Sequence, residues 1–374
     1  MKTSPMETLR IVIAGGGTGG HVFPALAIGE ALRKKTPQVH LIYIGTRRGL
    51  EADVIPRAGG ELRTLWISGF ARRRIIQNLL LPVKLLVSFL QSFWLLLTVR
   101  PHVVVGTGGY VMGPVLWVAQ RLGMPTVLQE QNSFPGYTTR KLARRAQLVC
   151  AGFEETRNRL TGCEVIVTGN PLRPSFQTLN RERARAQWNF DYSRKTLLIF
   201  GGSAGARAIN EAVSAALSEL LKQWNLIWQT GRLGIPASTD SSIVQQAIAQ
   251  HRLIVREFIQ EMPEAYAVAD LAVCRAGAMT LAELAASGLP AVLVPYPHAA
   301  DDHQTSNAQS VTSAGAARII KDSELRATTL LNTVEDFVAS ENKLLDMAAK
   351  MKSLAKPDAA KRIADLVLSV ARKK

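Results

Sequence analysis

Short apolar runs rich in β-branched residues recur along the chain, and amphipathic segments separate them. The first half contains such runs at 11–14, 39–44, 103–105, 125–128, 148–150 and 165–167, and the second half at 196–200, 226–229, 254–256, 271–274 and 291–294. Runs this short and apolar are typical of strands buried on both faces. Strands that alternate with helices predict an α/β fold with doubly wound parallel sheets, which bind ligands at the carboxyl ends of their strands.

A polar and charged stretch from Gln177 to Arg194 interrupts this pattern, which then restarts. The restart predicts two domains, 1–175 and 176–340, each a Rossmann-like sheet whose glycine turns face one central cleft. Residues 341–374 are predicted to form a helical tail with basic residues, and we expect it to pack back on the first domain.

The first strand runs directly into a glycine turn and an amphipathic helix over 25–35. Gly15, Gly17 and Gly20 have the G-x-G-x-x-G spacing of a dinucleotide fold, and backbone N–H groups at a helix start bind anions. The acid that normally closes the next strand and binds a ribose is absent, and two arginines stand there. The turn therefore indicates a phosphate site rather than a dehydrogenase. His21 follows the last glycine, within reach of whatever the turn binds.

The most apolar part of the chain is residues 75–99. Pro82, Lys84 and Gln91 interrupt it, so a membrane span is not expected. Two interpretations stay open: a pair of core-facing helices that cover a sheet, or helices that also rest on a membrane surface. The second is based on an excess of large apolar residues over what one core face needs, with basic residues able to meet anionic headgroups. Its members are Arg72, Arg73, Arg74, Leu79, Leu80, Lys84, Phe89 and Trp94.

The charge balance narrows the classes of partner. The 374 residues carry a formal net charge of +16, which indicates an anionic partner. The basic segments lack a recognition-helix pattern and interleaved aromatic residues, so a nucleic acid is not expected, and an anionic bilayer accounts for the charge at least as well. Cys150, Cys163 and Cys274 have no metal or redox spacing, and we expect buried thiols in a reducing cytosol.

The segment from Cys274 to Leu284 combines a strand end with a helix that is predicted to begin near Thr280. Unpaired first-turn N–H groups at 278–280 suit a diphosphate, and Glu283, one turn further, can accept hydrogen bonds from the two hydroxyls of a ribose. A second interpretation is purely structural, because Thr280 and Glu283 have the spacing of a capping box. The local pattern leaves both open.

The segment 295–308 is a loop after a strand, rich in hydrogen-bonding side chains and followed by a helix. His298, Asp301 and His303 suggest a metal, but they lie in one short loop with no second cluster. No Asp-x-Asp at a strand end is available to hold a nucleotide-bound Mg²⁺. We therefore predict no metal site, and polar recognition of a sugar by this loop.

Taken together and in this order, these segments resemble the GT-B glycosyltransferases. The matching stretches are 15–25, 106–114, 130–132, 168–173, 201–206, 257–259, 274–288 and 295–308. The chain resembles in particular the members that act in bacterial peptidoglycan synthesis. That resemblance implies an inverting, metal-independent transfer of GlcNAc from UDP-GlcNAc to the 4-hydroxyl of MurNAc-pentapeptide on undecaprenyl pyrophosphate (lipid I to lipid II), without a cofactor. It also implies a peripheral enzyme on the cytoplasmic face of the inner membrane, with roles in cell shape and division and with other cell-wall synthesis proteins as partners.

The same resemblance implies a donor site mainly in the second domain. Ser203 and the turn at 278–280 would face the diphosphate, Ile259 the uracil, Glu283 the ribose and Gln304 the sugar. The full donor set is Thr18, Gly19, Gly20, Asn132, Arg173, Ser203, Ile259, Ala278, Met279, Thr280, Leu281, Ala282, Glu283 and Gln304. The first two glycine turns are left to face the acceptor pyrophosphate through Gly15, Gly16, Gly17, Gly106, Gly108, Gly109 and Tyr110.

An inverting transfer needs a base on the acceptor hydroxyl and neutralisation of the departing diphosphate, which helix N-termini can supply. His21 is the best candidate base, since neutral imidazole is available near pH 7; the alternative is that His21 only orients the loop or the substrate. The family often has His where this chain has Gln129, so no base is required at that position. Two other functions stay open: another lipid glycosyltransferase of this fold, or a UDP-GlcNAc 2-epimerase.

Overall fold

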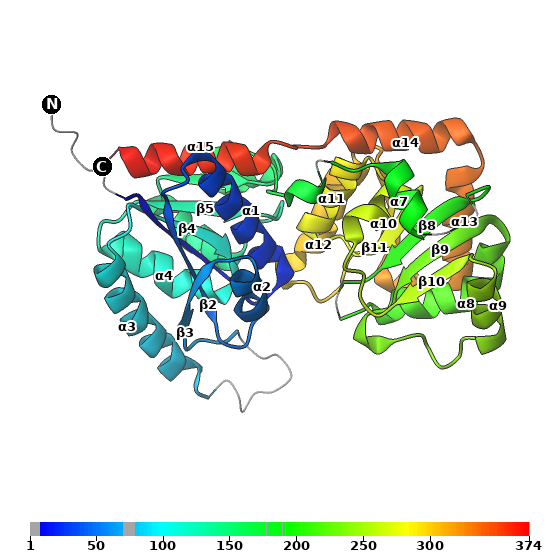
Figure 1. The fold of residues 1–374 in the computed structure, drawn as a ribbon, viewed down its shortest axis with the longest axis horizontal. Coiled ribbons are helices and arrows are strands. Elements are labelled where there is room, and N and C mark those ends of the chain that lie inside the picture. The colour runs from blue at the N-terminus through cyan, green and yellow to red at the C-terminus, as the bar shows by residue number, and fades with distance from the viewer. Residues whose placement is uncertain are drawn as a thin grey trace. The chain divides into compact units, whose positions relative to one another are not determined.

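The computed structural model describes residues 8–69, 79–176, 178–188, 190, 192–202 and 204–373. It contains two compact units. Unit 1 comprises Met1–Arg173 together with Pro357–Lys374, and unit 2 comprises Pro174–Lys356. Each unit is a parallel β-sheet covered by helices (Figure 1).

Unit 1 is built on a seven-stranded sheet whose neighbouring strands all pair in parallel. Its order is β3-β2-β1-β4-β5-β6-β7, with β1 Arg10–Gly15, β2 His40–Thr46, β3 Glu61–Leu65, β4 Val103–Gly108, β5 Thr126–Glu130, β6 Leu148–Ala151 and β7 Val165–Val167. Its helices are α1 Gly19–Lys35, α2 Glu51–Arg57, α3 Leu81–Val99, α4 Gly109–Arg121, α5 Tyr137–Leu142, α6 Glu155–Arg159 and α15 Ala359–Arg372. The strand order reverses between β1 and β4, so the carboxyl ends of these two strands form the switch point at which such sheets bind ligands.

Alternate residues of the central strands enter two apolar layers. Ile11 and Ile13 pack with residues of α1 and α15 on one face of the sheet, whereas Val12 packs with residues of α4 on the other face. All three side chains are essentially inaccessible to solvent. A strand covered on both faces needs an unbroken apolar run, which is why the sequence pattern marks the central strands clearly.

The C-terminal segment divides between the two units. α15 lies along α1 (Figure 1), and its Ile363 and Val367 join the core of unit 1. α14 (Glu341–Ser353) belongs to unit 2. The predicted tail of 341–374 is therefore too long, because residues up to 356 stay with unit 2 and only the last helix packs in unit 1.

Unit 2 is built on a six-stranded parallel sheet of order β10-β9-β8-β11-β12-β13. Its strands are β8 Lys195–Phe200, β9 Trp224–Gln229, β10 Leu253–Arg256, β11 Leu271–Cys274, β12 Ala291–Leu293 and β13 Ala317–Ile319. Its helices are α7 Arg181–Trp188, α8 Arg207–Gln223, α9 Ser241–Ala249, α10 Met262–Val268, α11 Ala278–Ser287, α12 His303–Thr312, α13 Ala327–Val338 and α14. The order reverses between β8 and β11, which places a second switch point at their carboxyl ends.

α3 leaves many of its large apolar side chains exposed. Along this helix, which is described throughout, the buried residues are Ser88, Ser92 and Leu96. The two serine hydroxyls donate to helix carbonyls three and four residues back, so their burial leaves no donor unpaired. On the opposite side, Leu86 and Trp94 are 62% and 67% exposed. Two serines on the buried face and large apolar residues on the exposed face reverse the usual pattern of a surface helix.

One face of α3 therefore covers unit 1, as the core-facing interpretation predicts, but that interpretation does not account for the large apolar side chains left exposed on the other face. By length and composition α3 could cross a membrane, although its serine face lies against unit 1 and is not available to lipid. Two members of the predicted membrane set face the protein: Lys84 donates to Ser68 Oγ at 3.0 Å, and Phe89 packs edge-to-face on Trp117. Arg72, Arg73 and Arg74 lie outside the described residues.

Candidate functional site

Two glycine turns meet at the switch point of unit 1. One leads from β1 into α1, which begins at Gly19, earlier than predicted, and the other leads from β4 into α4, which begins at Gly109. A Cβ on Gly15 would lie 2.0 Å from Thr107 Oγ1, and one on Gly109 would lie 2.3 Å from the carbonyl oxygen of Gly16. Because no side chain fits at these distances, the glycines are needed for the contact between the two turns.

His21 lies in the first turn of α1, with its imidazole against the second glycine turn. Its Nδ1 is 3.1 Å from the carbonyl oxygen of Thr107 and 3.3 Å from Gln131 Oε1. A carbonyl oxygen only accepts, so the contact places the proton of neutral imidazole on Nδ1 and the lone pair on Nε2. Gly108 makes the contact possible, since its φ is +106° and a Cβ there would lie 2.4 Å from His21 Nδ1. This tautomer suits a base that acts through Nε2.

Buried amide side chains hold the second glycine turn and the imidazole in place. Gln131 Nε2 donates to the Thr107 carbonyl at 2.7 Å, and Asn170 Nδ2 donates to the Gln131 carbonyl at 3.0 Å. Gln129 Nε2 donates to Asn170 Oδ1 at 3.1 Å. All three amide side chains are buried. Gln129 is thus a member of this supporting network, and sequence reasoning assigned Gln131 and Asn170 no such role although both lie in the matching stretches.

A buried carboxylate lies beneath the first glycine turn. Glu51 is 0% exposed. Its Oε2 accepts from the N–H of Gly17 at 2.9 Å, and its Oε1 accepts from the N–H and hydroxyl of Thr46 at 2.9 and 2.8 Å. Cβ atoms on Gly16 or Gly49 would lie 2.5 and 2.3 Å from its oxygens, so both glycines make room for it. Sequence reasoning missed Glu51, because its partners are mostly backbone groups.

The role of the first two glycine turns at the acceptor pyrophosphate stays a prediction, and the structure shows what already occupies three of these residues. The Gly17 N–H already donates to Glu51, and a Cβ on Gly106 would meet the Met112 side chain. The Tyr110 ring covers Gly17, and burial raises the pKa of its phenol. The start of α1 keeps anion-binding geometry, with Thr18 as its N-cap and Gly19 and Gly20 in its first turn.

Two other predicted donor residues of unit 1 are held by neighbours within that unit. The Arg173 guanidinium lies 4.9 Å over the Phe23 ring, and that ring also covers Gly19, so Arg173 lies beside the start of α1. The backbone and side-chain amides of Asn132 both donate to Oε1 of the buried Glu130, at 3.0 and 3.2 Å.

The switch point of unit 2 carries the third glycine turn. Gly205 (φ +81°) and Gly231 (φ +68°) bring this turn against the loop after β9, and a Cβ on Gly205 would lie 2.3 Å from the Thr230 carbonyl oxygen. Gln229 joins the turn to a further loop, since its Nε2 donates to the Gly202 carbonyl at 3.3 Å and its Oε1 accepts from the Ile259 N–H at 2.9 Å. Ser203 lies outside the described residues.

The contact of Ile259 with uracil stays a prediction, and the surroundings of this residue limit which of its groups could make it. The Ile259 side chain is 2% exposed, and its N–H is engaged by Gln229. A contact with the base would therefore fall to the remaining backbone of this segment.

α11 begins at Ala278, with Gly277 as its N-cap, which removes the capping-box interpretation because Thr280 is the third helical residue. Leu281 N–H makes the first helical bond, to the Gly277 carbonyl. The N–H groups of Met279 and Thr280 therefore precede the helical ladder and keep the anion-binding geometry predicted for them. Within the donor set, Leu281 and Ala278 have buried side chains and Ala282 is half-buried.

Glu283 is half-buried on α11 and is held by a tyrosine. The Tyr266 hydroxyl on α10 donates to Glu283 Oε2 at 3.0 Å. Tyr266 is itself buried and packs edge-to-face against Phe200 at the end of β8. One carboxylate oxygen is thus fixed by the protein, which orients the group beside the switch point. Sequence reasoning did not identify Tyr266.

The loop after β12 is fixed by Arg275, which bonds the carbonyls of Val294 and Pro295 at 3.1 and 3.2 Å and pairs with Asp322. Gln304 Oε1 accepts from the Tyr296 N–H at 2.9 Å and closes the loop onto α12. Glu283 and Gln304 therefore lie on neighbouring helices at the carboxyl edge of the sheet. Among the described residues, no group of three His, Cys, Asp or Glu side chains is arranged to hold a metal ion.

Two doubly wound units, each with a glycine turn at its switch point, are the architecture expected of a GT-B glycosyltransferase. Family models agree: residues 11–150 match the glycosyltransferase family 28 N-terminal domain, and residues 196–363 match its C-terminal domain. The chain belongs to glycosyltransferase family 28.

Close relatives span nearly the full chain. The UDP-N-acetylglucosamine--N-acetylmuramyl-(pentapeptide) pyrophosphoryl-undecaprenol N-acetylglucosamine transferase of Moorella thermoacetica is 42% identical over 96% of this chain and 98% of its own length. The protein of the same name from Salinibacter ruber is 41% identical over 96% of each chain. The crystal structure of Acinetobacter baumannii MurG superposes with a TM-score of 0.74 at 31% identity, covering 96% of this chain and 99% of that one.

Proposed function

We propose that the protein is an N-acetylglucosaminyltransferase that transfers GlcNAc from UDP-GlcNAc to the N-acetylmuramyl-pentapeptide of undecaprenyl pyrophosphate, forming the lipid-linked disaccharide precursor of peptidoglycan. The observation that carries this proposal is identity of 41 to 42% to transferases of that name over 96% of the chain. The switch point of unit 2 is consistent with it, because it combines a glycine turn, the start of α11 and an oriented carboxylate.

The chemistry follows from the groups at the two switch points. In unit 2, the N–H groups at the start of α11 stabilise the charge that develops on the departing diphosphate, and Glu283 accepts from the ribose hydroxyls. In unit 1, His21 takes the proton from the 4-hydroxyl of the acceptor through Nε2. Attack of that hydroxyl on the anomeric carbon, on the side opposite the diphosphate, inverts the configuration. This scheme uses protein groups for both tasks and needs no metal.

The direct test measures transfer by the full-length protein from UDP-GlcNAc to a short-chain prenyl-diphosphate MurNAc-pentapeptide. We expect an acceptor-dependent product that is heavier by one GlcNAc residue. Conversion of UDP-GlcNAc into its 2-epimer without acceptor would instead identify an epimerase. Transfer to a different lipid acceptor only would identify another lipid glycosyltransferase.

Glu283→Gln should raise the KM for UDP-GlcNAc about tenfold or more, because it weakens charge-assisted hydrogen bonds to the ribose. Tyr266→Phe should raise the same KM by a smaller factor, since it removes only the bond that orients the carboxylate. Initial rates at varied UDP-GlcNAc give both values. Glu219→Gln on α8, at an exposed ion pair, is the matched control. A KM for Glu283→Gln within twofold of the wild-type value would contradict the ribose assignment.

We further propose that the protein rests on the cytoplasmic face of the inner membrane through the exposed apolar face of α3, named here the α3 face: Leu79, Leu80, Val83, Leu86, Leu90, Phe93, Trp94 and Leu97. The net charge of +16 favours an anionic surface. A bilayer is the occupant that explains why serines face inward and leucines outward on this helix. Attachment at this membrane would place the enzyme with the lipid acceptor and with other proteins of cell-wall synthesis.

The double variant Leu86→Ser/Trp94→Ser should bind anionic phosphatidylglycerol vesicles at least about tenfold more weakly, because each exposed side chain gains roughly 1.5–3 kcal/mol on full burial. Vesicle co-sedimentation measures this, and wild-type binding should also weaken with added salt. Leu345→Ser, at a comparably exposed leucine of α14, should bind as the wild type does. Equal binding of the double variant and the control would rule out the α3 face.

A further inference from the structure

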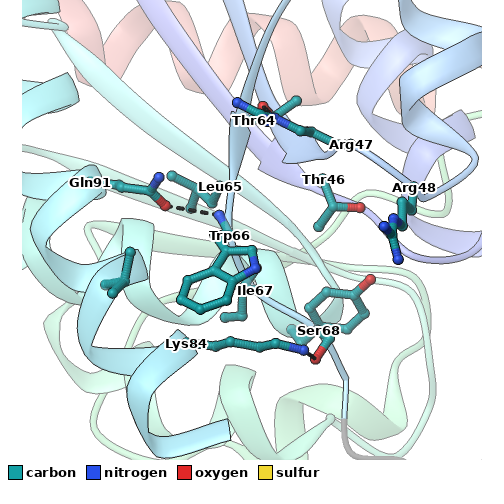
Figure 2. A pocket seen from close by; sticks show the side chains of 12 residues that line it. Thr46, Arg47, Arg48, Thr64, Leu65, Trp66, Ile67, Ser68, Lys84 and Gln91 are labelled. Atoms are coloured by element: carbon teal, nitrogen blue, oxygen red, sulfur yellow. Dashed lines mark hydrogen bonds between the residues drawn. The ribbon is translucent and has the colours of Figure 1, made fainter. Parts of the chain in front are cut away.

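A cavity of about 660 Å³ opens in unit 1 at the carboxyl ends of β2 and β3, against α3 (Figure 2). Lys84 reaches from α3 to Ser68 on one side of it, and Arg48 lies beside Thr46 on another side (Figure 2). Its volume lies within the range of small-molecule sites. Neither the donor set nor the candidate base lines this cavity.

Basic side chains line the wall of the cavity. These are Arg47, Arg48 and Lys84, and among the described residues no aspartate or glutamate lines it. Within the part of the chain that the structure describes, none of these three forms an ion pair. Lys84 donates to the neutral hydroxyl of Ser68, and Arg47 donates to that of Thr64. Three cations that line one cavity favour a multivalent anion such as a diphosphate.

The cavity also adjoins the α3 face. Lys84 lies next to Val83, which is 49% exposed, and Trp66 lines the cavity while remaining 47% exposed. A simple inorganic anion would use the cations only. A ligand with an anionic group and an apolar chain would contact both the cations and the α3 face, so the arrangement selects an amphiphile.

In the first glycine turn, the backbone at Gly17 is already engaged. The Gly17 N–H is engaged by Glu51, and Tyr110, which lines the cavity, covers Gly17. We propose that this cavity, and not the first glycine turn, binds the diphosphate of the polyprenyl-linked acceptor, with the prenyl chain leaving along the α3 face. This inference rests on the proposed transfer to a lipid-diphosphate acceptor, and it names the residues that recognise that acceptor.

The test compares Arg48→Gln and Lys84→Gln with the wild type, using the short-chain acceptor so that membrane binding does not enter. Each variant should raise the KM for acceptor about tenfold or more and leave the KM for UDP-GlcNAc unchanged. Arg48→Lys, which keeps the charge, should have a KM for acceptor between those of the wild type and Arg48→Gln. Lys34→Gln, the same charge change at an exposed position near the end of α1, should leave both values unchanged. Inorganic pyrophosphate should compete with the acceptor, and less strongly in the two variants.

The outcomes separate the alternatives. An acceptor KM within twofold of wild type in both variants overturns the proposal. If their binding to phosphatidylglycerol vesicles falls at the same time, the cavity binds phospholipid headgroups instead. Pyrophosphate that competes only with UDP-GlcNAc also overturns it. Absence of any GlcNAc transfer by the wild-type protein would refute the proposed function itself, and this result is obtained before any variant is measured.

Discussion

Glu51→Gln should lower the free energy of unfolding of unit 1 by about 2 to 4 kcal/mol. Both carboxylate oxygens accept from donors of the protein: Oε2 from the Gly17 N–H, and Oε1 from the N–H and hydroxyl of Thr46. A glutamine has one oxygen, so its amide nitrogen must face either Gly17 or Thr46. A buried N–H then points at another donor, and neither finds a partner, although the side chain keeps its shape.

Urea denaturation measures this loss, and hydrogen exchange of the β1 and β2 amides assigns it to unit 1, because two units of one chain can unfold separately. Glu30→Gln on α1 removes an exposed ion pair with Lys34 and should change the stability by less than about 0.5 kcal/mol. A change that small in Glu51→Gln would mean that the carboxylate is not needed to hold the turn.

The central strands were predictable because a strand buried on both faces has a continuous run of apolar residues in the sequence. The run at 196–200 corresponds to β8 within one residue, and the restart of the pattern marks the second sheet. The edge strands β3 and β13 were not predicted. Residues 61–65 mix charged and apolar side chains, and only Leu65 among them is buried, so their pairing is decided by the neighbouring strand and not by a local pattern.

The orientation of α3 shows a different limit. A helix that faces a core and a helix that faces a membrane can have the same apolar composition, so composition left both interpretations open. The distinguishing signal was the pair of serines in this apolar segment: Ser88 and Ser92 lie four positions apart and, with Leu96 four positions further on, form the buried face that packs on unit 1. Reading where the polar residues fall, rather than where the leucines fall, would have identified the inner face.

At the candidate site, the sequence identified residues that stand at strand ends and helix starts, such as His21 and Glu283. It missed the groups that hold them. Glu51 accepts from backbone donors, and Tyr266 donates to Glu283 from another helix. Neither contact produces a recognisable residue spacing in the sequence. The capping-box alternative at Thr280 could be rejected only once the helix start was known to the residue.

His21→Asn should lower kcat about 100-fold or more and leave the KM for UDP-GlcNAc unchanged, because it removes a general base without touching the donor site in unit 2. The asparagine amide can replace Nδ1–H as donor to the Thr107 carbonyl, so the glycine turns keep their contact. Asparagine has no basic nitrogen at the position of Nε2. Steady-state kinetics with both substrates varied measures the two constants.

The same substitution separates the two roles open to His21. If the imidazole only orients the turn, His21→Asn should stay near the wild-type rate and His21→Ala should be the slow variant. If Nε2 is the base, both variants should be slow. The wild-type rate should then fall toward low pH as the base is protonated, and this fall should be absent from the residual activity of His21→Asn.

Gln131→Leu tests the support of the imidazole, because it removes a partner of Nδ1 while leaving Nε2 in place. If the Thr107 carbonyl is the main partner of Nδ1, the Gln131→Leu enzyme should lose only a small part of the wild-type kcat and should keep the wild-type pH profile.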